Sequence, residues 1–307
     1  MDRRTLLTAT SGMAAACFFP AFPRASNTMV IRYEAMPSRF TGARNVSVWL
    51  PPDYQTSKRR YRVLYMHDGQ NIFAGSHAFG GESWRIDAVM EARAAEDPDH
   101  AAIVVGVWNT KMRAQDYTPT GIEKAMDSEL RTRAIEENGG ASGADGYLRF
   151  LVEELKPMID RDYRTKSDPA STFIMGSSMG GLISAYAICE YPHVFAGAGC
   201  LSTHWPIVCR GQVYKTHTCD TQAMIKAITT YLDQKLPRPG THRIWMDHGT
   251  QNLDSIYAPY QQAVDQMFTA KGWRQGVDFE SRIYDGADHN EASWRARLKE
   301  PLAFLLG

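Results

Sequence analysis

Ser178 stands at the centre of a glycine-x-serine-x-glycine motif, residues 176–180, which reads GSSMG. The apolar stretch STFIM precedes the motif, and the helical stretch GLISAYAICE follows it. A serine on a sharp strand-to-helix turn presents its hydroxyl as a nucleophile, and glycines relieve steric clashes beside it. The N-terminus of the following helix favours negative charge that develops there. A glycine-rich loop or a helix cap is the structural alternative, and Ser177 is expected to support the turn.

A serine nucleophile needs a base, and His289 is the candidate. It lies in the stretch DGADHNEASW, between the last expected strand and the last expected helix. A neutral imidazole is available near neutral pH to accept the serine proton. His67, His204 and His248 also lie near expected strand ends. Only His289 fits the chain order of nucleophile, acid and histidine.

Two carboxylates are candidates for the acid that would orient this histidine. The stretch WMDHGTQNLDSIY offers Asp247 and Asp254. A buried carboxylate would fix the imidazole tautomer and stabilise the imidazolium. We favour Asp254, because it lies on a loop that can turn back towards His289, whereas Asp247 ends the expected strand. The sequence leaves both open.

Acyl transfer through a tetrahedral intermediate also needs donors for an oxyanion. One would be the backbone N–H of Met179, directly after the serine. The other is expected in HDGQNIF, where Gly69 allows a close turn and the N–H of Gln70 would face the site.

Strands and helices alternate along the chain, which predicts an α/β fold with a mostly parallel central sheet and helices on both faces. The first strands have no helix between them, so antiparallel N-terminal strands are expected. The expected strands are 45–51, 62–69, 101–109, 171–176, 194–202, 242–249 and 278–286, and the expected helices are 84–96, 145–160, 180–190, 220–235, 256–272 and 292–306. Residues 109–143 form the longest irregular region, a candidate lid or substrate wall.

The first 26 residues have the features of an export signal. Arg3 and Arg4 precede a weakly apolar stretch, and small residues follow near position 25, which indicates a twin-arginine signal. Pro20 and Pro23 argue against the alternative of a buried N-terminal helix. We therefore expect a periplasmic or secreted protein in which residues 27–307 form a single domain.

Export would place the four cysteines of the mature chain in an oxidising compartment. Four cysteines allow three full pairings, which the sequence cannot separate. Cys209 and Cys219 flank a short polar segment and make the most plausible local bridge. Cys189, on an expected helix, and Cys200, on an expected buried strand, could instead be free buried thiols.

The composition and motifs give no reason to expect a nucleic acid, stable membrane insertion or a cofactor. The chain has 307 residues, with 34 basic and 34 acidic side chains and a net charge of +0. This balance gives no electrostatic case for nucleic acid. The N-terminal apolar stretch is too interrupted for stable membrane insertion. No metal-ligand motif or phosphate-binding fingerprint is present, so no cofactor is expected. The sequence does not address the oligomeric state.

Six stretches, taken in order, resemble one known family. They are LYMHDGQNIF, RAQDYTP, GSSMGGLISAY, STHWP, DHGTQNLD and GADHNEASW. Together they resemble the esterase family of α/β-hydrolases, which includes enterochelin esterases, feruloyl and acetyl-xylan esterases, S-formylglutathione hydrolases and mycolyltransferases. The resemblance spans the chain from about residue 28 to its end.

The resemblance implies the α/β-hydrolase fold and a serine carboxylic-ester hydrolase that works through an acyl-enzyme. It implies Ser178 as nucleophile, His289 as base and Asp254 as acid. Relatives often carry glutamate after the Gly-Thr pair, where this chain has Gln251. The residues that match stretches walling the substrate cleft are Arg113, Tyr117, His204 and Trp205. A structural role is the alternative, for example packing of Trp205, beside Pro206, under a loop.

The expected partner is a small-molecule or carbohydrate ester. Sugar acyl esters and siderophore-type lactones both agree with the resemblance. Acyl transfer to an acceptor other than water, and a non-catalytic binding protein with the same fold, are the alternatives.

Overall fold

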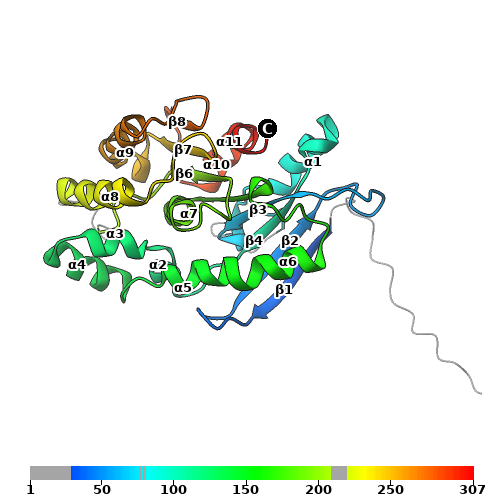
Figure 1. Ribbon diagram of the computed structural model, residues 1–307, viewed down its shortest axis with the longest axis horizontal. Helices are drawn as coiled ribbons and strands as arrows, with labels where there is room; N and C mark the ends of the chain where they lie inside the picture. The colour runs from blue at the N-terminus through cyan, green and yellow to red at the C-terminus, as the bar shows by residue number, and fades with distance from the viewer. Residues whose placement is uncertain (1–28, 76–77, 79–80, 209–219) are drawn as a thin grey trace, which may run out of the picture.

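The described chain forms one mixed sheet with an antiparallel end. The computed structural model describes residues 29–75, 78, 81–208 and 220–307. The sheet order is β1-β2-β4-β3-β5-β6-β7-β8. β2 pairs antiparallel with β1 and β4, and every other neighbouring pair is parallel (Figure 1). The strands are β1 (Met29–Met36), β2 (Arg44–Leu50), β3 (Arg62–His67), β4 (Ala102–Val107), β5 (Thr172–Ser177), β6 (Gly197–Leu201), β7 (Arg243–Gly249) and β8 (Phe279–Tyr284).

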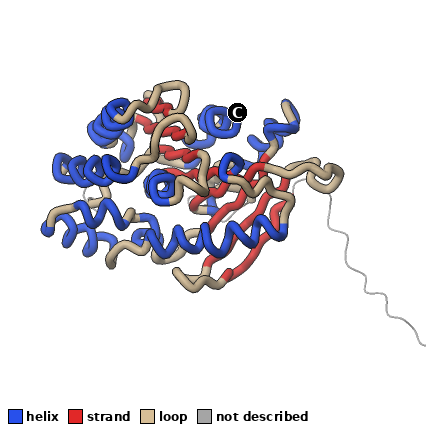
Figure 2. Tube along the Cα trace, viewed as in Figure 1, coloured by secondary structure: helices blue, strands red, loops and turns tan. Residues whose placement is uncertain are grey.

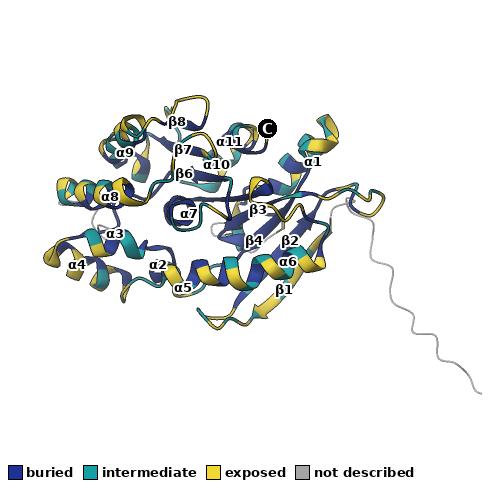
Figure 3. Cartoon of the chain, in the orientation of Figure 1, coloured by how far each residue is buried: buried dark blue, intermediate teal, exposed yellow. Residues whose placement is uncertain are grey.

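The central strands are apolar on both sides because both faces of the sheet are covered. In β3, Val63 and Tyr65 belong to one apolar core, whereas Leu64 belongs to another on the opposite face. The runs AIVVGV of β4 and TFIMGS of β5 are buried throughout. The edge strand β8 is mostly part exposed, and Figure 3 shows the buried residues concentrated at the centre of the sheet.

Helices cover the two faces, as Figure 2 shows. α5, α7, α8 and α9 supply side chains to the core that contains Val63, and α1, α10 and α11 supply the core that contains Leu64. The helices are α1 (Ile86–Glu96), α2 (Arg113–Tyr117), α3 (Thr120–Ala125), α4 (Ser128–Asn138), α5 (Ala144–Arg149), α6 (Lys156–Asp162), α7 (Met179–Glu190), α8 (Thr221–Lys235), α9 (Ala258–Ala270), α10 (Glu291–Arg297) and α11 (Lys299–Leu306). The predicted fold class is confirmed.

The region 109–143 is not the irregular loop that the sequence predicted, because α2, α3 and α4 lie within it. α4 begins at a side-chain cap, since Asp127 accepts a hydrogen bond of 2.9 Å from the N–H of Leu130. It ends at Gly139, whose φ of 70° suits a left-handed helix cap. The strand β1 was also missed. It is an edge strand whose polar and apolar residues alternate over a part-exposed surface.

Some sequence predictions fall outside the described residues. The export signal lies in residues 1–26, and Cys209 and Cys219 lie in 209–219. Cys189 and Cys200 are both buried and free. Within the ranges that the structure describes, no helix has the length and apolarity needed to cross a bilayer.

Candidate active site

Ser178 occupies the turn between β5 and α7 in a strained conformation. Its φ is 58° and its ψ is −125°, which costs a residue other than glycine about 1–3 kcal/mol. Backbone bonds hold it there. Its N–H donates to the carbonyl of Leu201 at 2.9 Å, and its carbonyl accepts from the N–H of His204 at 3.0 Å. The turn thus holds the hydroxyl at the carboxyl edge of the sheet.

Packing explains the glycines around Ser178. A Cβ on Gly176 would lie 2.7 Å from the carbonyl carbon of Gly180, which is backbone and cannot move aside. A Cβ on Gly180 would lie 3.2 Å from the Cβ of His67. The motif therefore reflects the close approach of β5, α7 and the end of β3.

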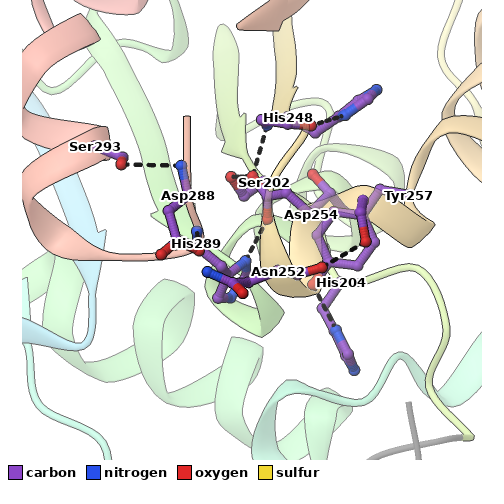
Figure 4. Close-up of polar contacts among 12 residues, drawn as sticks. Ser202, His204, His248, Asn252, Asp254, Tyr257, Asp288, His289 and Ser293 are labelled. Carbon is purple, nitrogen blue, oxygen red and sulfur yellow. Dashed lines mark hydrogen bonds and ion pairs between the residues drawn. The ribbon is translucent and has the colours of Figure 1, made fainter. Parts of the chain in front are cut away.

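Asp254 and His289 come together from two different loops. His289 lies between β8 and α10, and Asp254 lies in a short turn, Asn252–Ile256, that follows β7. The Nδ1 atom of His289 is 2.5 Å from Oδ1 of Asp254 (Figure 4). An ionised carboxylate can only accept, so Nδ1 carries the proton. Nε2 of His289 is then the atom that can accept a proton.

Asp254 is fully buried and yet favours its charged form. Burial alone would raise the pKa of this carboxyl. Hydrogen bonds outweigh burial, because His289, the hydroxyl of Ser202 and the N–H of Gly249 all donate to the carboxylate, the last two at 2.6 Å. These donors hold the pKa of Asp254 below its ordinary value.

The other candidate acid points elsewhere. Asp247 accepts hydrogen bonds of 2.8 Å from Arg297 and from the indole N–H of Trp245. The structure therefore places Asp254, and not Asp247, against His289. The carboxylate of Asp288 accepts a hydrogen bond of 2.6 Å from the backbone N–H of His289, and the N–H of Asp288 donates to the hydroxyl of Ser293 at 3.1 Å.

Two aromatic rings fix the plane of the imidazole. The ring of Trp294 lies edge-on to that of His289, with centroids 5.0 Å apart. The ring of Tyr257 does the same at 5.8 Å. Tyr257 is itself held by a hydrogen bond of 2.8 Å between its hydroxyl and Nδ1 of His204 (Figure 4).

Ser178 and His289 line one cavity of about 790 Å³. Among the described residues no hydrogen bond joins the hydroxyl to the ring, which is common in structures without substrate. Gln70 also lines this cavity, in the turn Gly69–Asn71 that follows β3. Met179 is the first residue of α7. Both expected oxyanion donors thus lie on segments that border the serine.

His67 lines the same cavity but is not suited to act as a base. Its side chain is buried, and burial lowers the pKa of His67 to about 3. Nδ1 of this ring lies 2.7 Å from the hydroxyl of Tyr147. His67 is therefore a neutral packing residue at neutral pH.

Of the four residues expected to wall the substrate cleft, Arg113 lines the cavity and the other three are buried elsewhere in the fold. Tyr117 is buried under the guanidinium of Arg113, 5.1 Å from it. Trp205 is buried and donates to Gln261 at 2.9 Å. His204 is buried against Tyr257. These three side chains are buried, and none of them is among the residues that line the cavity.

Several residues that line the cavity were not predicted from the sequence. They include Asp68, which binds Arg113, and Trp84, Asn109, Glu291 and Trp294. Asp68 lies in the same HDGQNIF stretch as Gln70, and Glu291 and Trp294 follow His289 in HNEASW, so the quoted motifs already contained these three residues. Within the described ranges, no group of three or more potential ligands lies close enough to hold a metal ion.

Comparisons with known proteins agree with this architecture. The sequence profile of the family described as "Putative esterase" matches residues 38–305. The uncharacterized protein YbbA of Bacillus subtilis (strain 168) is 24% identical over 272 residues, covering 87% of this chain and 94% of that protein. The ferri-bacillibactin esterase BesA of the same organism is 29% identical over 153 residues, covering 47% of this chain and 49% of that protein.

A solved structure of a ferulic acid esterase superposes with a TM-score of 0.63 at 17% identity, covering 91% of this chain and 97% of that one. At this identity the likeness shows the fold alone, which is the α/β-hydrolase fold.

Proposed function

This chain belongs to the "Putative esterase" family, and from that premise we propose that it is a serine carboxylic-ester hydrolase with Ser178, His289 and Asp254 as its catalytic triad. The observation that carries the proposal is the contact of 2.5 Å between His289 and Asp254 at the cavity that Ser178 lines. A hydrogen-bonded acid and histidine beside a serine on a strained turn is the arrangement required for acyl transfer.

The proposed reaction has two stages. Oγ of Ser178 attacks the ester carbonyl carbon while Nε2 of His289 takes the hydroxyl proton. The tetrahedral intermediate collapses to an acyl-enzyme, and the leaving alcohol receives that proton from Nε2. In the second stage His289 deprotonates a water, which attacks the acyl carbon. The carboxylic acid leaves as Oγ of Ser178 recovers its proton.

Two backbone donors would stabilise the oxyanion of each tetrahedral intermediate. We assign them to the N–H of Met179 and the N–H of Gln70, because α7 begins at Met179 and Gln70 lines the cavity. The N-terminus of α7 adds its dipole at the same point.

The proposed substrate is a small ester, with a sugar acyl ester or a siderophore-type lactone as the two classes. The cavity volume of about 790 Å³ lies within the ordinary range for small-molecule sites. Trp84 and Trp294 offer apolar surface, and the amides of Asn71 and Asn109 offer hydrogen-bonding groups. The names of BesA and the ferulic acid esterase support these classes only by similarity.

We also propose that the protein is exported, on the grounds of the paired arginines and the apolar stretch in residues 1–26. N-terminal sequencing of the protein from the periplasm should find a start near residue 27. A full-length cytoplasmic product would contradict export.

Hydrolysis of short-chain p-nitrophenyl esters tests the catalytic proposal. Ser178→Ala should abolish turnover and labelling by a fluorophosphonate probe, whereas Ser177→Ala should keep the labelling. Equal rates for Ser178→Ala and the wild type would show that the serine assignment is wrong. Product analysis with an added sugar alcohol would separate hydrolysis from acyl transfer.

A further inference from the structure

Behind the Asp254 carboxylate lies a buried polar network that the proposed triad does not include. We propose that Ser202 is a positioning residue, whose hydroxyl holds Asp254 in the orientation that His289 needs. The inference rests on the proposed function and adds a residue to its machinery. Ser202 directly follows β6 and is fully buried.

The hydrogen bonds of the Ser202 hydroxyl leave it a single orientation. It lies 2.6 Å from Oδ2 of Asp254, 2.9 Å from the indole N–H of Trp294 and 2.8 Å from a guanidinium nitrogen of Arg297. The indole and the guanidinium can only donate, so they take both lone pairs of the oxygen. The hydroxyl proton must therefore point at Asp254.

The two oxygens of the Asp254 carboxylate have different hydrogen-bond partners. Oδ2 of Asp254 accepts from Ser202 and from the N–H of Gly249, both at 2.6 Å. Oδ1 accepts from His289. With Oδ2 occupied by two fixed donors, the carboxylate cannot rotate without losing buried hydrogen bonds, so Oδ1 stays aimed at Nδ1.

These contacts form a closed cycle of four residues that includes the imidazole of His289. Trp294 donates to Ser202, Ser202 donates to Asp254, and Asp254 accepts from His289. The ring of His289 in turn packs edge-on against Trp294, with centroids 5.0 Å apart. Figure 4 shows Ser202, Asp254 and His289 side by side at this point. Each member therefore restrains the next.

A buried ion pair also contacts Ser202 and helps to fix its position. Arg297 binds Asp247 at 2.8 Å, and their side chains are 3% and 0% exposed. Asp247 also accepts the backbone N–H of Ser202 at 3.1 Å, which holds that residue at a φ of 42°. Asp247 thus compensates the charge of Arg297 and fixes the backbone from which the Ser202 hydroxyl points.

Two substitutions separate the hydroxyl from the strained backbone. Ser202→Ala and Ser202→Gly both remove the hydroxyl, but only glycine adopts a φ of 42° without strain. We expect both to lower kcat by about 10- to 100-fold with little change in KM, because a misaligned base slows chemistry and not binding. Ser281→Ala is the matched control. It removes a serine hydroxyl that donates at 2.9 Å to a different carboxylate, the part-buried Asp265.

NMR spectroscopy can report on the hydrogen bond between His289 and Asp254 without any measurement of turnover. The proton on Nδ1 of His289 should give a far-downfield ¹H NMR signal that shifts or broadens in Ser202→Ala and stays unchanged in Ser281→Ala. Trp294→Phe keeps a ring against His289 and removes one donor to Ser202, so it should give a smaller change of the same kind.

The outcomes distinguish this inference from the proposed function. Unchanged kcat and an unchanged Nδ1 signal in both Ser202 variants would overturn the positioning role. A loss of kcat in Ser202→Ala that Ser202→Gly restores would also overturn it, because the backbone and not the hydroxyl would then be responsible. A wild type without Ser178-dependent turnover would refute the proposed function, and the NMR comparison would still decide the role of Ser202.

Discussion

The guanidinium of Arg113 makes two hydrogen bonds to the carboxylate of Asp68, of 2.8 and 2.7 Å. This paired geometry ties the first residue of α2 to the residue that follows β3. Asn109 also donates to Asp68, at 2.6 Å, and the N–H of Asn109 donates to the side chain of Gln70. The pair therefore fixes the segment that borders the proposed oxyanion donor.

Arg113→Ala should lower both stability and activity. It leaves the carboxylate of Asp68, which is 11% exposed, without its counter-charge, at a cost of about 2–3 kcal/mol in the free energy of unfolding. We also expect kcat/KM to fall by about 10-fold, because the segment that carries the proposed oxyanion donor Gln70 is no longer held in place. Urea unfolding and ester hydrolysis measure the two effects. The control is Arg39→Ala, whose exposed pair with Glu154 should cost under about 1 kcal/mol. Equal losses in both variants would contradict the role of Arg113.

Gly176→Ala should disrupt the serine turn. Its Cβ would lie 2.7 Å from a backbone atom of Gly180, so β5 or α7 must shift. We expect a loss of about 3 kcal/mol or more and slower fluorophosphonate labelling of the folded protein. Gly42→Ala is the control, because a Cβ there meets nothing within 4 Å. Thermal unfolding compares the two. A Gly176 variant as stable and reactive as the wild type would contradict the steric account.

Asp254→Asn should lower kcat by about 10³- to 10⁴-fold, because an amide no longer fixes the proton on Nδ1 of His289. Asp247→Asn leaves the contact of 2.5 Å between His289 and Asp254 in place. Its main effect should be lower stability, since Arg297 loses its buried partner. Rates per active site, counted by fluorophosphonate titration, compare the two variants. A larger kcat loss in Asp247→Asn would reverse the assignment of the acid.

The sequence predicted the elements that continuous apolar runs and serial order determine. The runs around Val104 and Ile174 identified buried strands, and the order Ser178, Asp254, His289 selected the three candidates of the proposed triad, which lie on three different loops. The short helices of residues 113–138 were not predicted from the sequence, because their apolar faces are small and their caps are single residues.

The contacts that position the site residues could not be predicted from the sequence, for a different reason. Ser202 and Arg297 are 95 residues apart, and Asp68 and Arg113 are 45 apart. They meet only because β3 lies between β4 and β5 and because α10 packs below the end of β6. Nothing in the local pattern around Ser202 indicates which donors surround its hydroxyl. Such pairings depend on the folded sheet order.

Burial of His67 should make the protein lose stability as the pH falls below about 6.5, the ordinary pKa of histidine. Burial is the largest cause of the lowered pKa, which is about 3 in the folded protein. Between these values the unfolded chain binds a proton that the folded protein does not, so the free energy of unfolding rises with pH. The slope is about 1.4 kcal/mol per pH unit, or about 2 kcal/mol between pH 5 and 6.5.

Urea unfolding at pH 5, 6 and 7 measures this slope in the wild type and in His67→Gln. The pKa values of Asp68 and Asp254 are lowered, so their contributions are complete above about pH 4 and are lost only below it. Burial raises the pKa values of Glu291 and Asp265, which act in the opposite sense but cancel between the two proteins. His67→Gln should therefore depend less on pH by about 2 kcal/mol over that window. Parallel curves would show that His67 is protonated as readily in the folded protein as in the unfolded chain.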